Sequence, residues 1–292
     1  MKIVMTMVVR NEEDILATNI DYHKSRGVDY FLVIDHLSTD STSEILQKYQ
    51  REGILEYFRE NDPAFRQGKW VTQMARRAAD EHSADWVINS DADEFWWPEG
   101  DASFKEILEN VPKEVEYLNV ETGLFVYLAD CKEDFLSQMT SRRVGSFKNG
   151  NYKKTIHRAF SDIRVAEGNH KVWRTKPVRS LVAGTAPFLI LRFPIRRLEQ
   201  IKLKILNGVE ARNKVEELEG RNSGHWRKIH EKILSGNFDQ WGDDLIAENE
   251  LMDKDPKKIV HDYRLRDYML DLKREGRITV HYQSISLNSD VL

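Results

Sequence analysis

Two aspartates separated by one residue, Asp91 and Asp93, follow an apolar stretch at residues 86–88 of this 292-residue chain. Carboxylates at positions i and i+2 of an extended segment point to the same side, so both can reach one cation. Mg²⁺ and Mn²⁺ are usually held by one or two carboxylates together with substrate phosphate oxygens. The pair therefore predicts a divalent-metal site, although a solvated acidic turn has the same composition. The buried strand before it and the aromatic run 95–97 after it favour the metal site.

A lone carboxylate, Asp35, follows a second apolar stretch at residues 30–34. In nucleotide-binding sheets an acid at this place accepts hydrogen bonds from a ribose or a base. The alternative is a residue that caps a turn or a helix. The segment 10–13, after the first apolar stretch, holds no glycine, and the chain has no Walker A pattern. These features argue against a dinucleotide cofactor and against ATP-driven phosphoryl transfer.

Apolar and amphipathic segments alternate through about the first 100 residues. The predicted strands are residues 2–9, 30–34, 54–58 and 86–88, and the predicted helices between them are 11–27, 41–52 and 70–81. This order predicts a mostly parallel sheet with helices on both faces. Ligands of such sheets bind beyond the carboxyl ends of the strands. The polar residues expected to converge on that edge are Arg10, Asn11, Glu12, Asp35, Asp91 and Asp93.

The pattern changes after about residue 115. Residues 117–128, 143–147 and 152–160 predict strands of an antiparallel or mixed extension, and residues 168–172 predict a turn that enters another strand. The chain beyond Pro194 becomes helical and rich in charge. We therefore predict an α/β fold with two domains, residues 1–195 and 196–292, in which the second packs on the sheet or mediates oligomerisation.

Several segments together resemble one known family. They read VRNEEDIL at residues 9–16, IDHLSTDST at residues 34–42 and SDADEF at residues 90–95. They resemble the opening and the D-x-D-E-F motif of family-2 glycosyltransferases, in the branch that begins with an R/K-N-E-x-x-I-L pattern. The resemblance implies a GT-A fold, which is Rossmann-like, that binds a nucleotide-diphosphate sugar together with Mn²⁺ or Mg²⁺.

The resemblance also implies roles for individual residues. Asp35 would contact the base or ribose, Asp91 the ribose or sugar, and Asp93 the metal on the diphosphate. Asp91 is a second candidate metal ligand from its spacing. The other residues expected at the nucleotide are Arg10, Asn11 and Glu12 in the pocket, Ser38 and Asp40 in the loop beneath it, and Arg66 and Lys69 before the third helix.

Two departures from the family pattern concern the metal and the catalytic base. Many relatives carry a histidine where this chain has Arg192, so His170 is the remaining candidate for a third metal ligand. Arg192 could instead contact the donor phosphate directly. Deprotonation of an acceptor hydroxyl needs a carboxylate, and the candidates for this base are Glu94, Asp130, Glu133 and Asp134.

Some aromatic and basic residues have two interpretations. Trp96, Trp97 and Trp173 either pack in the core or stack on a sugar ring. The pairs Lys153-Lys154 and Arg142-Arg143 are either solvated or face an acidic or lipid-diphosphate acceptor.

The composition indicates which partners and which cell compartment are expected. The net charge of −4 gives no global basic field, so nucleic acid is not an expected partner. A single cysteine, Cys131, suggests a reducing compartment. The sequence shows neither a signal peptide nor a spanning segment. We therefore expect a cytoplasmic protein, with at most peripheral contact at the inner face of the membrane, and a homo-oligomer is compatible with the sequence.

These observations predict a glycosyltransferase of hexosyltransferase type. Its donor would be a UDP- or GDP-linked sugar, and its acceptor a glycan, a lipid-linked sugar or another molecule, as in surface polysaccharide synthesis. Two alternatives are a non-catalytic protein that binds nucleotide sugars or glycans, and a sugar-phosphate nucleotidyltransferase. The second normally has a glycine-rich loop after its first strand, which residues 8–13 lack.

Overall fold

The computed structural model describes residues 1–100, 102–131, 134–144, 153–175, 178–179, 182–219 and 224–278. The chain forms two compact units. Unit 1 consists of Met1–Gly123, Ser146–Arg192 and Asn207–Ser223, and unit 2 of Leu124–Gly145, Phe193–Leu206 and Gly224–Leu292. The units interleave along the chain, whereas the sequence predicts one boundary after residue 195.

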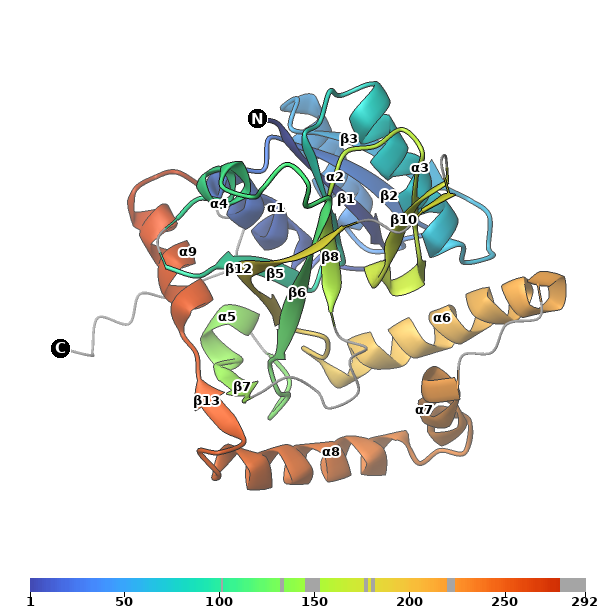
Figure 1. The fold of residues 1–292 in the computed structure, drawn as a ribbon. Helices are drawn as coiled ribbons and strands as arrows, with labels where there is room; N and C mark the ends of the chain where they lie inside the picture. Colours follow the sequence, from blue (N-terminus) through green and yellow to red (C-terminus); the bar gives the residue numbers. More distant parts are fainter. Residues whose placement is uncertain are drawn as a thin grey trace. The chain divides into compact units, whose positions relative to one another are not determined.

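Unit 1 is built on an 8-stranded sheet within the described residues, in the order β3-β2-β1-β4-β8-β6-β12-β5 (Figure 1). Its first half is parallel and comprises β1 (Ile3–Val9), β2 (Tyr30–His36), β3 (Leu55–Glu60) and β4 (Trp86–Ser90). The pairs β4–β8, β6–β8 and β12–β5 are antiparallel. These strands are β5 (Glu94–Pro98), β6 (Tyr117–Leu124), β8 (Lys154–Arg158) and β12 (Ala183–Arg192). The predicted α/β class, with a parallel half and a mixed extension, is confirmed.

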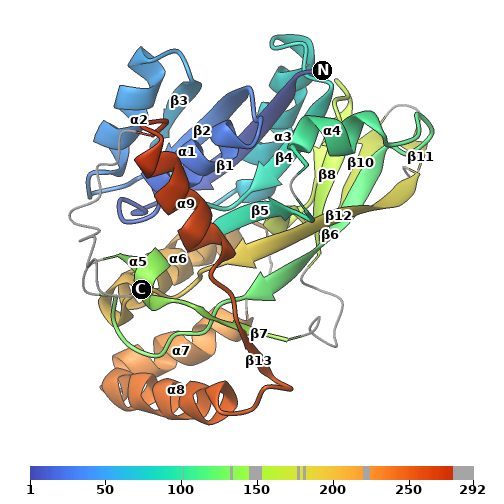
Figure 2. The same cartoon turned by 90° about the vertical axis from the view of Figure 1, so that its left-hand side faces the viewer.

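Helices cover both faces of this sheet, as Figure 2 shows from the side. They are α1 (Leu16–Ser25), α2 (Thr42–Arg51), α3 (Gln67–Asp80) and the short α4 (Phe104–Glu109). On one face, Trp70 and Met74 of α3 pack with Val4, Leu32 and Val87 of the parallel strands. Successive side chains of a strand point to opposite faces. Strands β1, β2 and β4 are almost entirely buried, which explains their nearly continuous apolar runs, whereas β3 at the edge of the sheet is mostly half-buried.

A small sheet and a turn of 3₁₀ helix complete the face that carries α3. The sheet has the order β11-β10-β9 and is antiparallel. Its strands are β9 (Ile163–Val165), β10 (Val172–Thr175) and β11 (Val178–Arg179), and the 3₁₀ helix η1 is Glu167–Asn169. Gly68 of α3 lies so close to Glu167 that an added Cβ would come within 3.2 Å of its backbone nitrogen. This close packing fixes η1 against the start of α3.

Helix α1 fixes strand β5 from the other face. The amide of Asn19 donates hydrogen bonds to the backbone oxygens of Ala92 and Glu94 at 2.9 and 2.8 Å. The hydroxyl of Tyr22 donates to the backbone oxygen of Trp96 at 3.0 Å. Asn19 and Tyr22 are fully buried. The turn that carries the predicted metal motif is therefore held by side chains as well as by its own backbone.

Unit 2 is mainly helical, as predicted for the C-terminal region. Its helices are α5 (Phe135–Gln138), α7 (Gly224–Leu234), α8 (Phe238–Asp253) and α9 (Arg264–Arg274), and α6 (Leu198–Glu219) belongs to both units. Strands β7 (Ser141–Arg143) and β13 (Ile259–His261) form an antiparallel pair. Most of the strand predicted at residues 143–147 lies outside the described residues. No helix in the described part of the chain is long and apolar enough to cross a membrane.

Candidate active site

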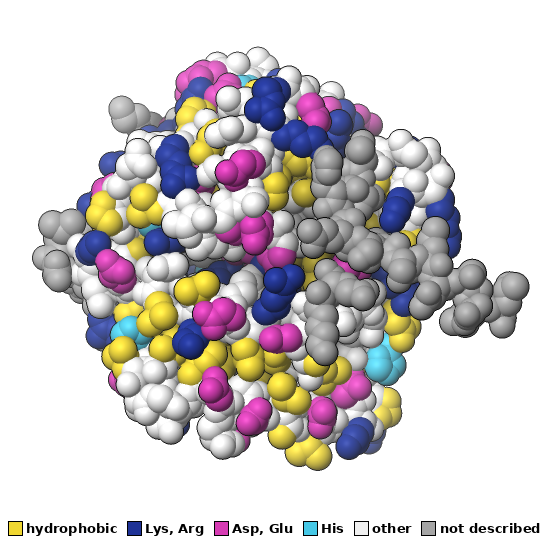
Figure 3. All heavy atoms as spheres, turned by 180° about the vertical axis from the view of Figure 1, so that it is seen from behind, with side chains coloured by type: hydrophobic (Ala, Val, Ile, Leu, Met, Phe, Trp, Pro, Cys, Tyr) yellow, Lys and Arg dark blue, Asp and Glu magenta, His cyan; other side chains and the backbone are white. Residues whose placement is uncertain are grey.

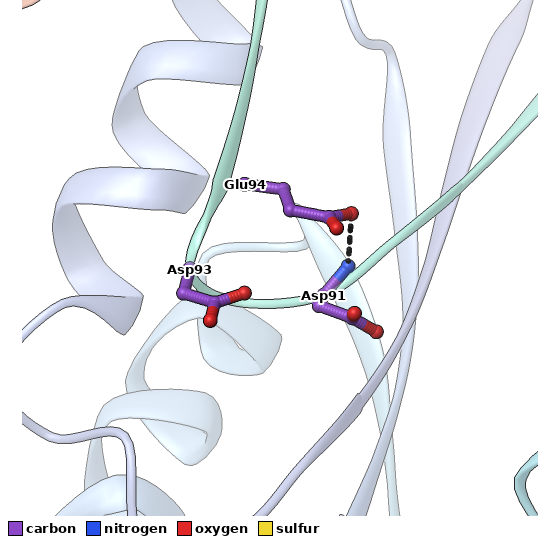
Figure 4. A group of neighbouring side chains, drawn as sticks. All are labelled: Asp91, Asp93 and Glu94. Atoms are coloured by element: carbon purple, nitrogen blue, oxygen red, sulfur yellow. Dashed lines mark hydrogen bonds between the residues drawn. The ribbon is translucent and has the colours of Figure 1, made fainter. Parts of the chain in front are cut away.

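Three carboxylates gather at the carboxyl end of β4. Asp91, Asp93 and Glu94 present ligand atoms that all lie within 4.8 Å of one another. The turn between β4 and β5 is tight, because the backbone N–H of Glu94 donates to the backbone oxygen of Asp91 at 3.1 Å. The Glu94 side chain reaches back and accepts the Asp91 N–H at 3.1 Å (Figure 4). The predicted metal motif therefore forms a compact acidic cluster that includes Glu94.

Two basic side chains lie inside this acidic cluster. The Nζ atom of Lys154 is 2.8 Å from Asp91 Oδ2 and 3.0 Å from Glu94 Oε1. The Nε atom of Arg192 is 3.5 Å from Asp93 Oδ1 and 3.8 Å from Glu94 Oε1, and its Nη2 is 3.8 Å from Asp91 Oδ2. With all groups ionised, three negative charges face two positive ones.

The antiparallel extension explains how these cations reach the cluster. Arg192 stands directly opposite Glu94 in the pairing of β12 with β5. Lys154 begins β8, which runs antiparallel to β4, so its start lies beside the end of β4 that leads to Asp91. Only 2% of the Lys154 side chain is exposed, whereas 25% of Arg192 and 24% of Asp91 are. The cluster is therefore open to solvent on the side of Asp91 and Arg192.

The carboxylate oxygen of Asp91 that does not contact Lys154, Oδ1, accepts hydrogen bonds from two amide side chains. Gln67 donates to Asp91 Oδ1 at 3.2 Å and accepts the backbone N–H of Gly168 at 3.1 Å. Asn169 donates to the same Oδ1 at 3.5 Å. Gly168 and Asn169 both have a positive φ, 72° and 60°, which turns the chain toward the cluster. Sequence reasoning missed Gln67 because it placed the start of this helix at Trp70.

Burial and charge shift the pKa values of the cluster in opposite directions. Burial raises the pKa of Glu94 to about 7 against the opposing effects of Lys154 and Arg192. Burial also acts to raise the pKa of Asp91, but Lys154 and Arg192 outweigh it and lower this pKa below its ordinary value. Burial acts to lower the pKa of Lys154, yet Asp91 and Glu94 raise it overall. Asp91 and Lys154 thus form the firmly ionised pair.

Hydrogen bonds join the loop after β1 (residues 10–15) to the loop after β2 (residues 37–41). We refer to these two loops together as the cup. The backbone N–H of Asn11 donates to Ser38 Oγ at 3.0 Å, and Asn11 Oδ1 accepts the Thr39 N–H at 2.8 Å. The Glu12 N–H donates to Thr42 Oγ1 at 2.9 Å. Asn11 has a φ of 54° and does not cap α1, which begins at Leu16. Asp40 also joins the two loops by accepting the Glu13 N–H at 3.2 Å.

Asp35 lies near the end of β2, just before the second of these two loops. Its carboxylate accepts the Ser38 N–H at 2.9 Å, the Ser43 hydroxyl at 2.6 Å and Arg59 Nη1 at 2.6 Å. Its side chain is fully buried. Arg10 follows β1, whose Val9 pairs with Asp35. Burial lowers the pKa of Arg10, although Glu210 of α6 and Asp35 act to raise it. The structure thus brings the residues predicted for the nucleotide pocket into one edge of the sheet.

Other predicted residues lie in different settings. Arg66 precedes α3 and forms an ion pair with Asp62, and Lys69 is exposed on α3. His170 donates through Nδ1 to the Lys153 carbonyl oxygen at 2.9 Å. Among the described residues, the group of ligand atoms within 4.8 Å of one another does not include His170. Burial lowers the pKa of His170, which favours the neutral imidazole that metal binding requires.

The remaining candidates for the catalytic base belong to unit 2. Asp134 caps α5, where its two carboxylate oxygens accept the backbone N–H groups of Leu136 and Ser137 at 3.0 and 3.1 Å. Asp130 accepts the hydroxyl of Tyr127 at 2.7 Å. Glu133 lies outside the described residues. A catalytic role for any of these carboxylates stays a prediction.

The structure resolves several of the open interpretations. Trp96 is a core residue, because it is fully buried and its indole N–H donates to Ser90 Oγ at 2.9 Å. Trp97 stacks on Tyr22 with ring centroids 6.0 Å apart. The interpretation of Lys154 as a solvated residue is wrong, since it is buried in the acidic cluster. Adjacent residues of a strand face opposite sides, which separates Lys154 from its exposed neighbour Lys153.

The donor set of the cluster fits a divalent cation in its chemistry. Carboxylate oxygens are the ligands that Mg²⁺ and Mn²⁺ prefer, and Asp91, Asp93 and Glu94 offer them within 4.8 Å. Asp91, which is 24% exposed, and Asp93, which is 2% exposed, would hold such an ion. The ion would supply positive charge for the oxygens of a bound diphosphate.

Known proteins resemble this chain to different degrees. The search of curated proteins found no match. Among solved structures, S. aureus TarS 1-349 in complex with UDP is 15% identical with a TM-score of 0.38, covering 71% of this chain and 65% of that chain. Mycobacterium tuberculosis glucosyl-3-phosphoglycerate synthase, crystallised with Mn²⁺, UDP and glucosyl-3-phosphoglycerate, is 19% identical with a TM-score of 0.30, covering 42% of this chain and 44% of that chain. These likenesses are loose, and this chain spans less than two thirds of TarS 1-349.

The match to a protein family is more extensive. The model of glycosyltransferase family 92 matches residues 4–177. This segment contains the cup, the acidic cluster and Lys154, and it exceeds half of the 292 residues. The resemblance to glycosyltransferases seen in the sequence is therefore confirmed, and this protein belongs to glycosyltransferase family 92.

Proposed function

We propose that this protein transfers a sugar from a nucleotide-diphosphate sugar, UDP- or GDP-linked, to a carbohydrate or lipid-linked acceptor with the help of a divalent cation. The observation that carries this proposal is the acidic cluster at the carboxyl end of β4, with Arg192 beside it. Strands β2, β1 and β4 are consecutive in the sheet, so the cup formed after β1 and β2 belongs to the same edge. Ligands of α/β sheets bind at such edges.

The cup is the proposed site of the nucleoside. Asn11 and Ser38 hold the two loops together, so their backbone is rigid before a ligand arrives, which reduces the entropy cost of binding. Arg10 would provide a guanidinium for the base or ribose, and the fully buried Asp35 would reach them by exchanging one of its hydrogen bonds with Ser43 or Arg59. The remaining residues proposed to shape the pocket or reach the donor are Glu12, Asp40, Arg66 and Lys69.

The cluster is the proposed site of the diphosphate and the sugar. During transfer the bond from the anomeric carbon to the diphosphate oxygen breaks, and a bond to the acceptor oxygen forms. Negative charge develops on the leaving diphosphate, and Arg192 would stabilise it there. Asp91 and Asp93 would hold the divalent cation, with His170 as a third ligand. This arrangement would place the leaving group next to positive charge fixed before the reaction begins.

The acceptor hydroxyl must lose its proton as the new bond forms, and the proton goes to a carboxylate of the enzyme. Glu94 is one candidate for this base, because a pKa near 7 suits proton transfer at neutral pH. Asp130, Glu133 and Asp134 are the other candidates from the sequence. Glu94 is fully buried, so it would act only if the bound donor opens a path to it.

The balance of charges agrees with a small-molecule donor rather than with nucleic acid. Figure 3 shows basic and acidic side chains interspersed over the face that it draws. The net charge is −4. A cytoplasmic location, with at most peripheral membrane contact, is part of the proposal, as is a role in polysaccharide synthesis.

A second candidate function is non-catalytic binding of a nucleotide sugar. The ion pairs of Lys154 with Asp91 and Glu94 favour this function, because Lys154 already neutralises carboxylate oxygens that a metal ion would need. Release of free nucleoside diphosphate from a nucleotide sugar in the presence of an acceptor separates the two functions. Binding without turnover across a panel of acceptors would support the second candidate.

The proposal is tested by calorimetry with UDP and GDP in the presence of Mn²⁺, Mg²⁺ or EDTA. We expect one nucleotide to bind, with higher affinity when a divalent cation is present. Asp93→Ala should lose the effect of the cation and keep the fold. If neither nucleotide binds under any of these conditions, the proposed function is wrong.

A further inference from the structure

Lys154 is a buried cation for which the proposed reaction gives no role. Its Nζ lies within 3.0 Å of carboxylate oxygens from Asp91 and Glu94, and its side chain is 2% exposed. Its neighbour Lys153 is 48% exposed and pairs with Glu121 at 3.7 Å. Burying an ammonium group is costly and is tolerated only with close partners. The position of Lys154 is therefore set by the cluster and not by a need for surface charge.

Lys154 and a divalent cation need the same oxygens. Asp91 Oδ2 contacts Lys154, while Asp91 Oδ1 accepts hydrogen bonds from the amides of Gln67 and Asn169. Glu94 Oε1 contacts Lys154, and Glu94 Oε2 accepts the N–H of Asp91. A divalent cation at this place would also be repelled by the ammonium group, and the repulsion is strong in a site with little water.

We propose that Lys154 is a positioning residue that holds Asp91 and Glu94 in place and keeps the affinity for a divalent cation low until a nucleotide diphosphate binds. This inference rests on the proposed function. The phosphate oxygens of the nucleotide attract Lys154 and Arg192 away from the carboxylates. They also supply further oxygen ligands to the cation. Nucleotide and cation therefore bind cooperatively, each raising the affinity for the other by the same factor.

The test compares Mn²⁺ binding without nucleotide in the wild-type protein, Lys154→Met and the matched control Lys153→Met. Calorimetry and the electron paramagnetic resonance of free Mn²⁺ measure the affinity independently of activity. We expect Lys154→Met to bind Mn²⁺ alone at least about tenfold more tightly than the wild type, and Lys153→Met to match the wild type. Lys154→Arg, which keeps the charge, should restore weak binding. Equal or weaker Mn²⁺ binding by Lys154→Met would overturn the proposal.

A second pair of variants tests the proposal in case Lys154→Met does not fold. Lys154→Met combined with Glu94→Gln removes one charge of each sign, and its control is Glu94→Gln alone. The double variant should bind Mn²⁺ more tightly than this control, and the opposite order refutes the role of Lys154. Titration of the wild type with UDP and GDP, with and without Mn²⁺, tests the proposed function separately. If no nucleotide binds, that function fails, while the comparison of Mn²⁺ affinities still decides the role of Lys154.

Discussion

Replacing Glu94 by glutamine tests the electrostatics of the cluster through the stability of the protein. Burial raises the pKa of Glu94 from 4.5 to about 7 in the folded state. Between these two pH values the folded protein binds more protons at this group than the unfolded chain does. The free energy of unfolding therefore falls as the pH rises through this window. Stability from this group is fully present below pH 4.5 and is lost by a pH above about 7.

The size of the effect follows from the two pKa values. A pKa difference of one unit corresponds to about 1.4 kcal/mol. The difference between 4.5 and about 7 thus amounts to about 3 kcal/mol over the whole window. About 2.5 kcal/mol of this falls between about pH 5 and about pH 8. Glutamine has a similar shape and does not titrate, so Glu94→Gln should lose this part of the pH dependence.

The assay is urea-induced unfolding of wild type and variant at several pH values, followed by circular dichroism. Glu121→Gln is the matched control, because Glu121 is 54% exposed and pairs with Lys153 rather than with the cluster. We expect the stability of Glu94→Gln to gain on that of the wild type as the pH rises, and Glu121→Gln to follow the wild type. Parallel curves for wild type and Glu94→Gln would mean that Lys154 keeps Glu94 ionised throughout, and the reasoning from burial would be refuted.

Four further substitutions test other parts of the site. Asp93→Asn should abolish the Mn²⁺ dependence of nucleotide binding in calorimetry, and an unchanged dependence would remove Asp93 from the metal site. Arg192→Ala should lower kcat more than it raises the acceptor KM, because the lost charge acts on the leaving group; an effect confined to the acceptor KM would place Arg192 near the acceptor. Asp35→Ala should weaken nucleotide binding by about 1–3 kcal/mol without changing the metal dependence, and unaltered affinity would leave Asp35 with only its role in the loop. Asp134→Ala should cost about 1 kcal/mol of unfolding free energy through the lost cap of α5, and normal turnover would exclude Asp134 as the base.

The parallel half of the sheet could be predicted from the sequence because its signals are local. Each strand is an apolar run closed by polar residues, and the helices between them end near Gly27 and Gly53, both with positive φ. Asp35 and Asp91 could be assigned to one edge since parallel strands end on the same side. The predicted ends were less accurate. Strand β2 extends to His36 and therefore includes Asp35, which was expected in the following loop.

The antiparallel half could not be predicted in the same way, since its pairing joins residues far apart in the chain. Strand β5 follows the acidic motif directly, and its bulky aromatic residues gave no alternation of polar and apolar positions. The pairing of Arg192 with Glu94 depends on the register of β12, which no local pattern reports. Lys154 is the clearest case. Two consecutive lysines suggest a solvated surface, and only the strand geometry separates the buried one from the exposed one.

The parallel and antiparallel halves of the sheet contribute different parts of the proposed site. Loops of the parallel half form the cup, the proposed site of the nucleoside, where the Asn11 N–H donates a hydrogen bond to Ser38. The antiparallel half brings the cations, with Lys154 on β8 and Arg192 on β12, to carboxylates that the turn after β4 supplies. Changes in the cup should therefore alter nucleotide affinity at any metal concentration. Changes in β8 and β12 should alter the coupling between nucleotide binding and metal binding. If substitutions in the cup and in these two strands affected nucleotide affinity and this coupling alike, the proposed division of the site would be wrong.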